Sequence, residues 1–171
     1  TDSAQVGRLI EARQIQDLML NGRNPLRLPM LKAGVRSNTA FGAFNPTEFS
    51  NGAWVINGSR PDENILTYDG VPALRTRSAG ANIGLPDVDT IQEVQVLTSS
   101  FAAEFGRASG GQVRIVTKGG SRDFHGALYE NYRNEGLDAN TWARNASGDA
   151  VQMAGPPLVD FNQFGYNLSG P

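Results

Sequence analysis

The strongest strand signals in the chain are the stretches IQEVQVL (residues 91–97) and VRIVT (residues 113–117). In both stretches apolar residues alternate with polar or charged ones, which is typical of a strand that buries one face and exposes the other. A glycine pair at positions 110 and 111 precedes the second stretch and breaks any regular structure between them. The sequence therefore predicts two β-strands joined by a turn-rich connection.

Further strands are expected on the N-terminal side of these two. The runs at 54–57 and 65–68 are short and rich in β-branched or aromatic residues, which favours strands. The second run leads into Asp69-Gly70, a dipeptide typical of tight hairpin turns. Residues 36–53 and 72–88 are polar and rich in glycine and proline, so we expect two long loops there.

Three helices are expected, all of them short. Apolar residues recur three and four positions apart over residues 9–20, which predicts an amphipathic helix. Asn24-Pro25 has the order of a helix cap followed by proline at the first helical position, and Pro29 should limit this helix to about one turn. The hydroxyl residues at 98–100 are suited to cap a brief helix that carries Phe101 and Phe105.

Composition excludes several classes of function. The 171 residues contain 15 lysines and arginines against 17 acidic residues, which is not the basic excess that nucleic-acid binding requires. Cysteine is absent, which excludes disulfide scaffolds, thiol nucleophiles and cysteine-based zinc sites. His125 is the single histidine, so a multi-histidine metal site is excluded as well. No apolar run is long enough for a transmembrane helix.

The character of the sequence changes after Gly120. Residues 124–133 and 161–168 are aromatic and strand-like, and the first has the length of a tilted strand that crosses an outer membrane, about 9–11 residues. Residues 134–160 between them are polar and contain glycine and proline, which predicts a loop. We therefore expect a second, different unit to begin near residue 121.

Five motifs follow one another between residues 54 and 118: WVINGSR (54–60), LTYDGV (66–71), IQEVQVL (91–97), EFGR (104–107) and GGQVRIVTK (110–118). In this order they resemble the plug domain of TonB-dependent outer-membrane receptors. Three flanking motifs resemble the Oar-like subgroup, which carries a carboxypeptidase-regulatory-like domain upstream: LNGRN (20–24), DFHG (123–126) and NQFG (162–165). The resemblance covers nearly the whole chain.

The resemblance implies an α+β fold with a small mixed β-sheet, short flanking helices and long loops. It implies a plug domain over residues 1–120, followed over residues 121–171 by the beginning of the outer-membrane β-barrel, poorly ordered in isolation. Since the strands at 124–133 and 161–168 lack their barrel neighbours, we expect them to be disordered, folded back on the plug edge, or paired between copies.

The implied function is that of a gate. Such a plug blocks the barrel, contributes to cargo sensing and takes part in energy-coupled import, so the chain is expected to be neither an enzyme nor a cofactor-binding protein. The implied partners are TonB, through a segment upstream of this chain, the receptor's own β-barrel and an unidentified ligand. The implied location is the outer membrane, with the plug facing the periplasm. One alternative remains open, a free-standing periplasmic or secreted interaction module without a barrel.

Two sets of residues receive roles from the resemblance. Plug loops of this family face the cargo, which implies ligand contacts for Phe41, Phe44, Asn45, Arg75, Arg77 and Asn82. Plug charges in this family pair with the barrel wall, which implies latch roles for Arg60, Glu93, Glu104 and Arg107. Asn57 stands where the family has an arginine, so Arg60 is the substitute for it. The alternatives are disordered loops and solvated surface charges.

Two features of the sequence have a chemical and a structural interpretation. The glycines at 106–111 do not form a phosphate-binding loop, because Gln112-Val113 stand where lysine and a hydroxyl residue are required, and close packing explains them better. Asp87 and Asp89 are the acids on which a hydrolase alternative would rest, although acids in loops are usually solvated or turn-forming. No metal site is predicted.

Overall fold

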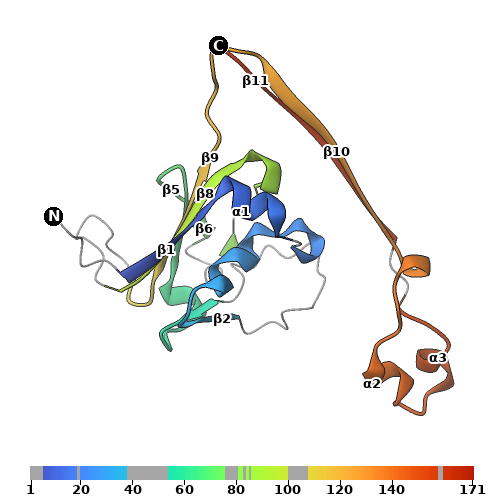
Figure 1. Cartoon of the computed structure of the whole chain (residues 1–171). Helices are drawn as coiled ribbons and strands as arrows, with labels where there is room; N and C mark the ends of the chain where they lie inside the picture. The colour runs from blue at the N-terminus through green and yellow to red at the C-terminus, as the bar shows by residue number, and fades with distance from the viewer. Residues whose placement is uncertain are drawn as a thin grey trace. The chain divides into compact units, whose positions relative to one another are not determined.

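The computed structural model describes residues 6–18, 20–37, 54–75, 81–82, 84, 86–99, 108–157 and 160–171. The chain divides into two compact units, Thr1–Lys118 and Gly119–Pro171, whose elements are shown in Figure 1. Among these described residues, no helix has both the length and the apolar character needed to span a membrane.

The described part of the first unit consists of short strands, a short α-helix and 3₁₀ turns. Its strands are β1 (Val6–Glu11), β2 (Val35–Ser37), β3 (Trp54–Ile56), β4 (Ile65–Tyr68), β5 (Val71–Pro72), β6 (Leu74–Arg75), β7 (Ala81–Asn82), β8 (Ile91–Ser99) and β9 (Gln112–Thr117). Its helical elements are α1 (Ala12–Asp17), η1 (Asn21–Arg23), η2 (Pro25–Leu31), η3 (Pro61–Glu63) and η4 (Val88–Thr90).

Five of these strands form the central sheet, in the order β1-β8-β9-β4-β5. β8 pairs antiparallel with β1 and with β9, whereas β4 runs parallel to β9 and antiparallel to β5; Figure 1 shows β1, β8 and β9 side by side. The two strands predicted at 91–97 and 113–117 are confirmed, and they lie at the centre of the sheet. The architecture is mixed α/β, with a multi-stranded sheet and few helices.

One face of this sheet carries the hydrophobic core. Alternate residues of the central strands, namely Val94, Val96, Val113 and Ile115, are no more than 1% exposed. Burial of such side chains is the main favourable term in folding. Buried side chains from α1, η2 and β3 belong to the same cluster: Ile15, Leu26, Leu28, Trp54 and Ile56. The helical turns therefore cover the sheet on this side.

The helix predicted over 9–20 is wrong in its first part. Residues 6–11 form β1, and the helix is limited to α1. Ile10 is fully buried while Leu9 is 47% exposed, which is the alternation of a strand rather than the stripe of a helix. Pairing with β8 outweighs the local helical pattern because it satisfies the backbone and buries Ile10 together. Ile15 is the buried residue of the shorter helix.

The predicted cap and turn are confirmed. Asn24 accepts a hydrogen bond from the backbone N–H of Leu26 at 2.9 Å and begins η2, which runs past Pro29 and is longer than the predicted single turn. Asp69 and Gly70 have φ angles of 47° and 83°, the left-handed conformation of a two-residue hairpin turn, here between β4 and β5.

The two predicted loops contain short strands where the structure describes them. Val35–Ser37 of β2 pairs with β3, and β6 pairs with β7. Residues 38–53 of the first loop lie outside the described residues. The brief helix predicted after Thr98 falls mostly on 100–107, which are also outside them, while Ser99 still belongs to β8.

The second unit is a long hairpin with a helical connection. β10 (His125–Asn134) and β11 (Asp160–Ser169) have 10 residues each and confirm the predicted strands. They pair antiparallel without a register shift, from His125 opposite Ser169 to Asn134 opposite Asp160. Three short elements lie between them: η5 (Glu135–Leu137), α2 (Trp142–Asn145) and α3 (Ala150–Met153).

This pairing corrects the expectation about the neighbours of these strands. We expected disorder, folding back on the plug edge or pairing between copies, whereas the two segments pair with each other within one chain. Antiparallel pairing in register satisfies the facing backbone groups of both strands, and the connection is long enough to let the chain reverse. Each strand therefore finds a neighbour along one of its edges within the chain itself.

Hydrogen bonds within the connection hold α2 and α3 together. The amide nitrogen of Asn140 donates to the carbonyl of Gln152 at 2.9 Å, and Nε of Arg144 donates to the amide oxygen of Asn140 at 3.1 Å. Asp149 caps α3 by accepting a hydrogen bond from the N–H of Val151 at 2.9 Å, and this bond lowers the pKa of the Asp149 carboxyl. The predicted loop is therefore an organised segment.

Candidate functional site

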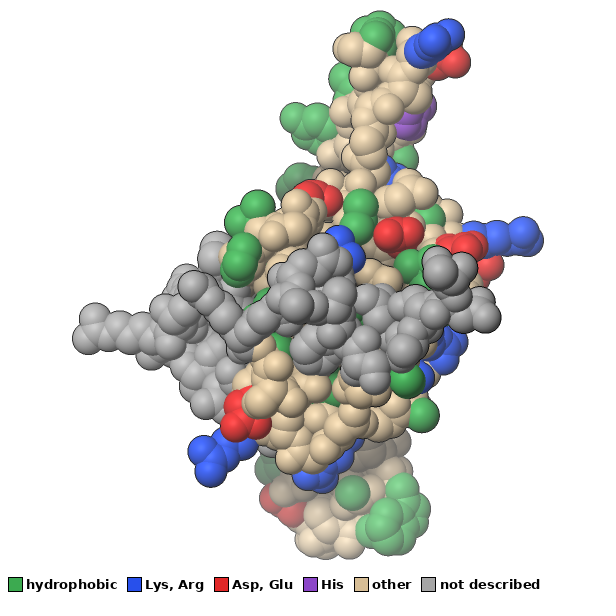
Figure 2. All heavy atoms as spheres, turned by 90° about the vertical axis from the view of Figure 1, so that its left-hand side faces the viewer, with side chains coloured by type: hydrophobic (Ala, Val, Ile, Leu, Met, Phe, Trp, Pro, Cys, Tyr) green, Lys and Arg blue, Asp and Glu red, His purple; other side chains and the backbone are tan. Residues whose placement is uncertain are grey.

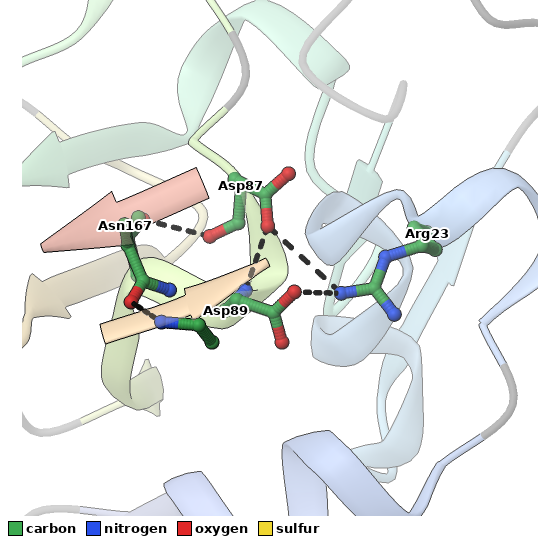
Figure 3. Close-up of polar contacts among 6 residues, drawn as sticks. Arg23, Asp87, Asp89 and Asn167 are labelled. Carbon is green, nitrogen blue, oxygen red and sulfur yellow. Dashed lines mark hydrogen bonds and ion pairs between the residues drawn. The ribbon is translucent and has the colours of Figure 1, made fainter. Parts of the chain in front are cut away.

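A partly buried ion-pair cluster joins two segments that lie far apart in the sequence (Figure 3). A guanidinium nitrogen of Arg23, in η1, lies 2.6 Å from a carboxylate oxygen of Asp89 and 3.9 Å from one of Asp87. The side chains of Arg23, Asp87 and Asp89 are 28%, 17% and 24% exposed. We call these three residues the Arg23 clamp. Solvent screens such charges less than it screens those of a fully exposed pair.

Backbone geometry on both sides fixes the clamp. Gly22 and Arg23 have φ angles of 66° and 50°, and a left-handed conformation at a residue other than glycine must be offset by its surroundings. On the other side, Asp87 caps η4 by accepting a hydrogen bond from the N–H of Asp89 at 2.8 Å. The clamp therefore attaches η1 and the start of η2 to the turn at which β8 begins.

Both acids of the clamp are already engaged. Asp89 accepts a hydrogen bond from Arg23, and Asp87 accepts one from the backbone. Acid–base catalysis needs a carboxyl group that can reach a substrate and exchange a proton with it, whereas the guanidinium lies against both carboxylates. The geometry therefore supports a structural role for Asp87 and Asp89. In the described part of the chain, no group of three or more His, Cys, Asp and Glu side chains is suited to hold a metal ion.

A second polar centre holds the glycine pair against β3. Asn64 is 1% exposed, and its amide nitrogen donates to the carbonyls of Trp54 at 2.8 Å and Arg60 at 3.2 Å. Its amide oxygen accepts from the N–H of Gly111 at 3.1 Å. We call Asn64 and these partners the Asn64 network. A Cβ atom at Gly111 would lie 2.8 Å from the carbonyl oxygen of Leu97, so glycine permits this close approach, as predicted.

An open depression of about 550 Å³ lies beside the Asn64 network. The residues that line it have mostly small or polar side chains. They come from the turn at Asn57, from the end of β8 and from the segment that contains Ser109. The carboxylate of Glu63, also in the lining, accepts a hydrogen bond from the backbone N–H of Arg60 at 3.0 Å. The amide of Asn57 donates to the carbonyl of Thr98 at 2.8 Å. Asn57 therefore holds the turn onto β8.

Tyr68, at the end of β4, makes the stability of the first unit depend on pH. Its hydroxyl donates to the carbonyl of Gly84 at 2.7 Å, and burial raises the pKa of Tyr68 to about 12. Since an unfolded phenol titrates near pH ~10, the contribution of Tyr68 is complete below that pH and is lost as the pH rises to about 12. Tyr68→Phe should lower the free energy of unfolding by about 1 kcal/mol at neutral pH and remove this dependence.

Urea denaturation at neutral pH and at alkaline pH measures this effect. The difference in stability between the original protein and the Tyr68→Phe variant should shrink as the pH rises. A difference that stays constant would show that the phenol does not titrate differently in the folded state.

Most of the predicted ligand-facing residues lie outside the described part of the chain, namely Phe41, Phe44, Asn45 and Arg77. The backbones of Arg75 and Asn82 lie in β6 and β7, where Arg75 is opposite Ala81 and Leu74 is opposite Asn82. This short ribbon brings the two residues to neighbouring positions. Their part in ligand binding stays a prediction.

The predicted latch residues do not form one cluster. Glu104 and Arg107 lie outside the described residues. Arg60 is exposed at the start of η3, and Glu93 lies in β8 opposite Glu11 and Val116. In the segments that the structure describes, neither Arg60 nor Glu93 forms an ion pair. Their latch roles stay predictions.

Sequence reasoning did not single out Arg23 or Asn64. Arg23 follows a glycine that ends a helical pattern, and Asp87 and Asp89 precede a predicted strand, so each half of the clamp has a recognisable local context. Nothing in the sequence pairs position 23 with position 89. Asn64 follows a short acidic turn, and an asparagine side chain at such a position is ordinarily exposed to solvent.

Comparisons with known proteins agree on one family. Residues 116–171 match the family model described as an outer membrane beta barrel domain. The TonB-dependent transporter Oar of Myxococcus xanthus is 30% identical over 116 residues, which are 68% of this chain and 11% of that protein. The chain thus spans a small part of the curated relative that it matches.

Two solved structures, a siderophore receptor and an outer membrane transporter, share the fold. The siderophore receptor PirA from Acinetobacter baumannii aligns with 96% of this chain at a TM-score of 0.61 and 22% identity, over 22% of its own length. The outer membrane transporter YddB from Escherichia coli aligns with 95% of this chain at a TM-score of 0.64 and 18% identity, over 23% of its length. At these identities the likeness concerns the fold alone.

The relatives are transporters and receptors rather than enzymes. The barrel-domain match supports a location in the outer membrane. The chain therefore belongs to the TonB-dependent receptor family.

Proposed function

We propose that residues 1–120 are the plug domain of a TonB-dependent outer-membrane transporter of the Oar-like subgroup, and that residues 121–171 begin its β-barrel. The observation that carries the proposal is the order of the two units. A mixed sheet built around β8 and β9 is followed by a hairpin of two 10-residue strands, within the segment that matches an outer-membrane barrel domain. This order fits a gate that fills the lumen of its own barrel.

The proposed work of this chain is conformational. The plug blocks the barrel, contributes to cargo sensing and is remodelled when TonB pulls from the periplasm, with energy from the proton gradient of the inner membrane. TonB would bind a segment upstream of this chain. Siderophore receptors such as PirA share the fold, so a siderophore is one candidate cargo beside peptide, oligosaccharide and protein.

Three groups of residues receive proposed roles. The first is the ligand-facing set, Phe41, Phe44, Asn45, Arg75, Arg77 and Asn82. The second is the latch set toward the barrel wall, Arg60, Glu93, Glu104 and Arg107. The third is the Arg23 clamp, which would keep η1 and η2 on the sheet while other parts of the plug move, since it joins segments 66 positions apart.

Deletion of residues 6–118 from the complete receptor tests the gate. Cells that make the plugless barrel should become sensitive to vancomycin, an antibiotic too large for ordinary porins. The reason is that barrels of outer-membrane transporters, with about 22 strands, enclose a wide lumen that is open once the plug is removed. Arg13→Gln in the complete receptor is the matched control. This substitution removes the ion pair between Arg13 and Asp17, whose side chains are 93% and 75% exposed, respectively. Resistance should therefore be unchanged.

Two measurements read the result. Growth in vancomycin reports the open channel, and heat-modifiable gel mobility reports that the barrel has folded. Unchanged resistance in cells with a folded plugless barrel would contradict the gate. Recovery of the native chain from the periplasm without a barrel would favour the free-standing interaction module.

A further inference from the structure

We propose that the connection between β10 and β11, taken with its end positions as residues 134–160, is a binding surface for a basic peptide segment that also carries apolar side chains. The proposed function gives this connection no role, so the inference goes beyond it and does not depend on the barrel. Three features of the connection support it: polar groups hold it together, its large apolar side chains face solvent, and acids outnumber bases in it.

Hydrogen bonds, rather than a hydrophobic core, hold the connection together. The guanidinium of Arg144 donates to the amide oxygen of Asn140 at 3.1 Å and to the carbonyl of Gly155 at 3.2 Å. The amide nitrogen of Asn140 donates in turn to the carbonyl of Gln152. None of the residues 135–157 is buried. The connection is therefore ordered without using its apolar side chains, which stay available for a partner.

The large apolar side chains of the connection lie in solvent. Their exposed fractions are 79% for Leu137, 83% for Trp142, 79% for Val151 and 50% for Met153. Hydrophobic side chains of this unit are visible on the surface in Figure 2. Single exposed apolar residues are ordinary on a protein surface, whereas several large ones on one short segment indicate an interaction site. A partner that removes them from water would gain the hydrophobic term.

Trp142 is the principal contact that the connection offers. It is the first residue of α2, and Thr141 caps this helix by accepting a hydrogen bond from the backbone N–H of Arg144 at 3.4 Å. The backbone that carries the indole is therefore fixed. Tryptophan is enriched among the residues that dominate interface energies, and the face of its ring attracts the cations of lysine and arginine. An exposed tryptophan thus fits a basic partner.

Negative charge selects among the possible occupants of this surface. Residues 134–160 contain four acids and one arginine. Asp138 lies 3.2 Å from Arg133, whereas Glu135 and Asp160 form no ion pair with any residue that the structure describes. A second copy of the connection or an anionic lipid surface would meet charge of the same sign, which disfavours both. A basic peptide would meet opposite charge and is the occupant that fits.

Fluorescence anisotropy of a labelled peptide tests the inference on the 171-residue chain. The probe is a short synthetic peptide of lysine and leucine residues separated by glycine, and two control peptides replace either lysine by glutamate or leucine by serine. The protein variants are Trp142→Ala, Val151→Ser and Glu135→Gln. Leu128→Ser is the matched control, because it removes an apolar side chain of β10 that is 87% exposed and lies outside the connection. Far-ultraviolet circular dichroism verifies that each variant keeps the fold.

The expected losses of affinity follow the proposed contacts. Trp142→Ala should weaken binding of the lysine–leucine peptide about tenfold, as truncation of a dominant interface residue does. Val151→Ser and Glu135→Gln should each weaken it about twofold to threefold. The glutamate peptide should not bind, the serine peptide should bind about tenfold more weakly, and added salt should weaken binding of the original pair. Leu128→Ser should leave the affinity unchanged.

Several results would overturn the inference. If the lysine–leucine peptide does not bind, the surface does not take a basic peptide. Equal affinities for the lysine and glutamate peptides would show that charge does not select the partner. Equal affinities of the original chain and Trp142→Ala would place the binding elsewhere. A dimeric chain that becomes monomeric with Trp142→Ala would assign the surface to a second copy.

The same comparison in the complete receptor shows whether the surface stays open there. If Trp142→Ala does not change the affinity of the complete receptor, segments of the receptor itself cover the connection, and the inference is wrong. None of these results depends on the vancomycin test, so failure of the gate and failure of this inference can be told apart.

Discussion

Replacement of Asn64 by leucine is expected to lower the free energy of unfolding of the first unit by about 3–4 kcal/mol. The two side chains are similar in volume, and Asn64 is 1% exposed, so little packing is lost. The cost arises because the carbonyl of Trp54 and the N–H of Gly111 keep their burial and lose their partner. Each buried polar group left without a hydrogen bond costs about 1–3 kcal/mol.

Urea denaturation of the 171-residue chain, followed by near-ultraviolet circular dichroism, measures this loss. Gln16→Leu is the matched control, because it adds the same side chain at an exposed position of α1 and should change stability by no more than ~0.5 kcal/mol. Equal losses in the two variants would show that the Asn64 network does not hold the glycine pair against β3.

Arg23→Met is expected to cost about 2–3 kcal/mol, less than the 3–5 kcal/mol that follows the breaking of a fully buried ion pair. Methionine keeps most of the aliphatic stem, so the change removes mainly the charge. Asp87 and Asp89, at 17% and 24% side-chain exposure, would then repel each other without the guanidinium between them. The left-handed backbone at Arg23 would also lose the contact that offsets its strain.

Hydrogen exchange separates a local effect of Arg23→Met from general unfolding. Exchange should rise in residues 20–31 and 87–91 more than in β9. Arg13→Met, which removes an exposed cation of α1, should leave exchange and stability unchanged. A uniform rise across the sheet would mean that the clamp does not fasten a particular segment.

The strands of this protein could be predicted from sequence where the side-chain pattern reflects the tertiary environment directly. IQEVQVL and VRIVT alternate because one side of β8 and β9 meets the core, and the Asp69-Gly70 turn follows from backbone geometry alone. The pairing of β4 with β9 was beyond such reasoning, since a parallel pair leaves no local mark in either strand.

The prediction failed where local and long-range preferences conflict. Residues 9–11 have helical spacing, yet they pair with β8 some eighty positions later. The Arg23 clamp has the same origin, because an ion pair between positions 23 and 89 depends on the route of the whole chain. The strands at 124–133 and 161–168 were found correctly, but their mutual pairing was not expected, because both were treated as lacking their barrel neighbours.

The position of β1 at the sheet edge also has a consequence for the order of folding. Val6 of β1 pairs with Ser99 of β8. The hydroxyl of Thr98 donates a hydrogen bond to the carbonyl of Val6, 92 positions away in the sequence. The hairpin of β10 and β11 closes over a much shorter stretch, and closing a shorter loop costs less entropy. As the chain emerges, β1 must therefore wait, unpaired, for nearly a hundred residues until β8 follows it, while the hairpin can close as soon as β11 arrives.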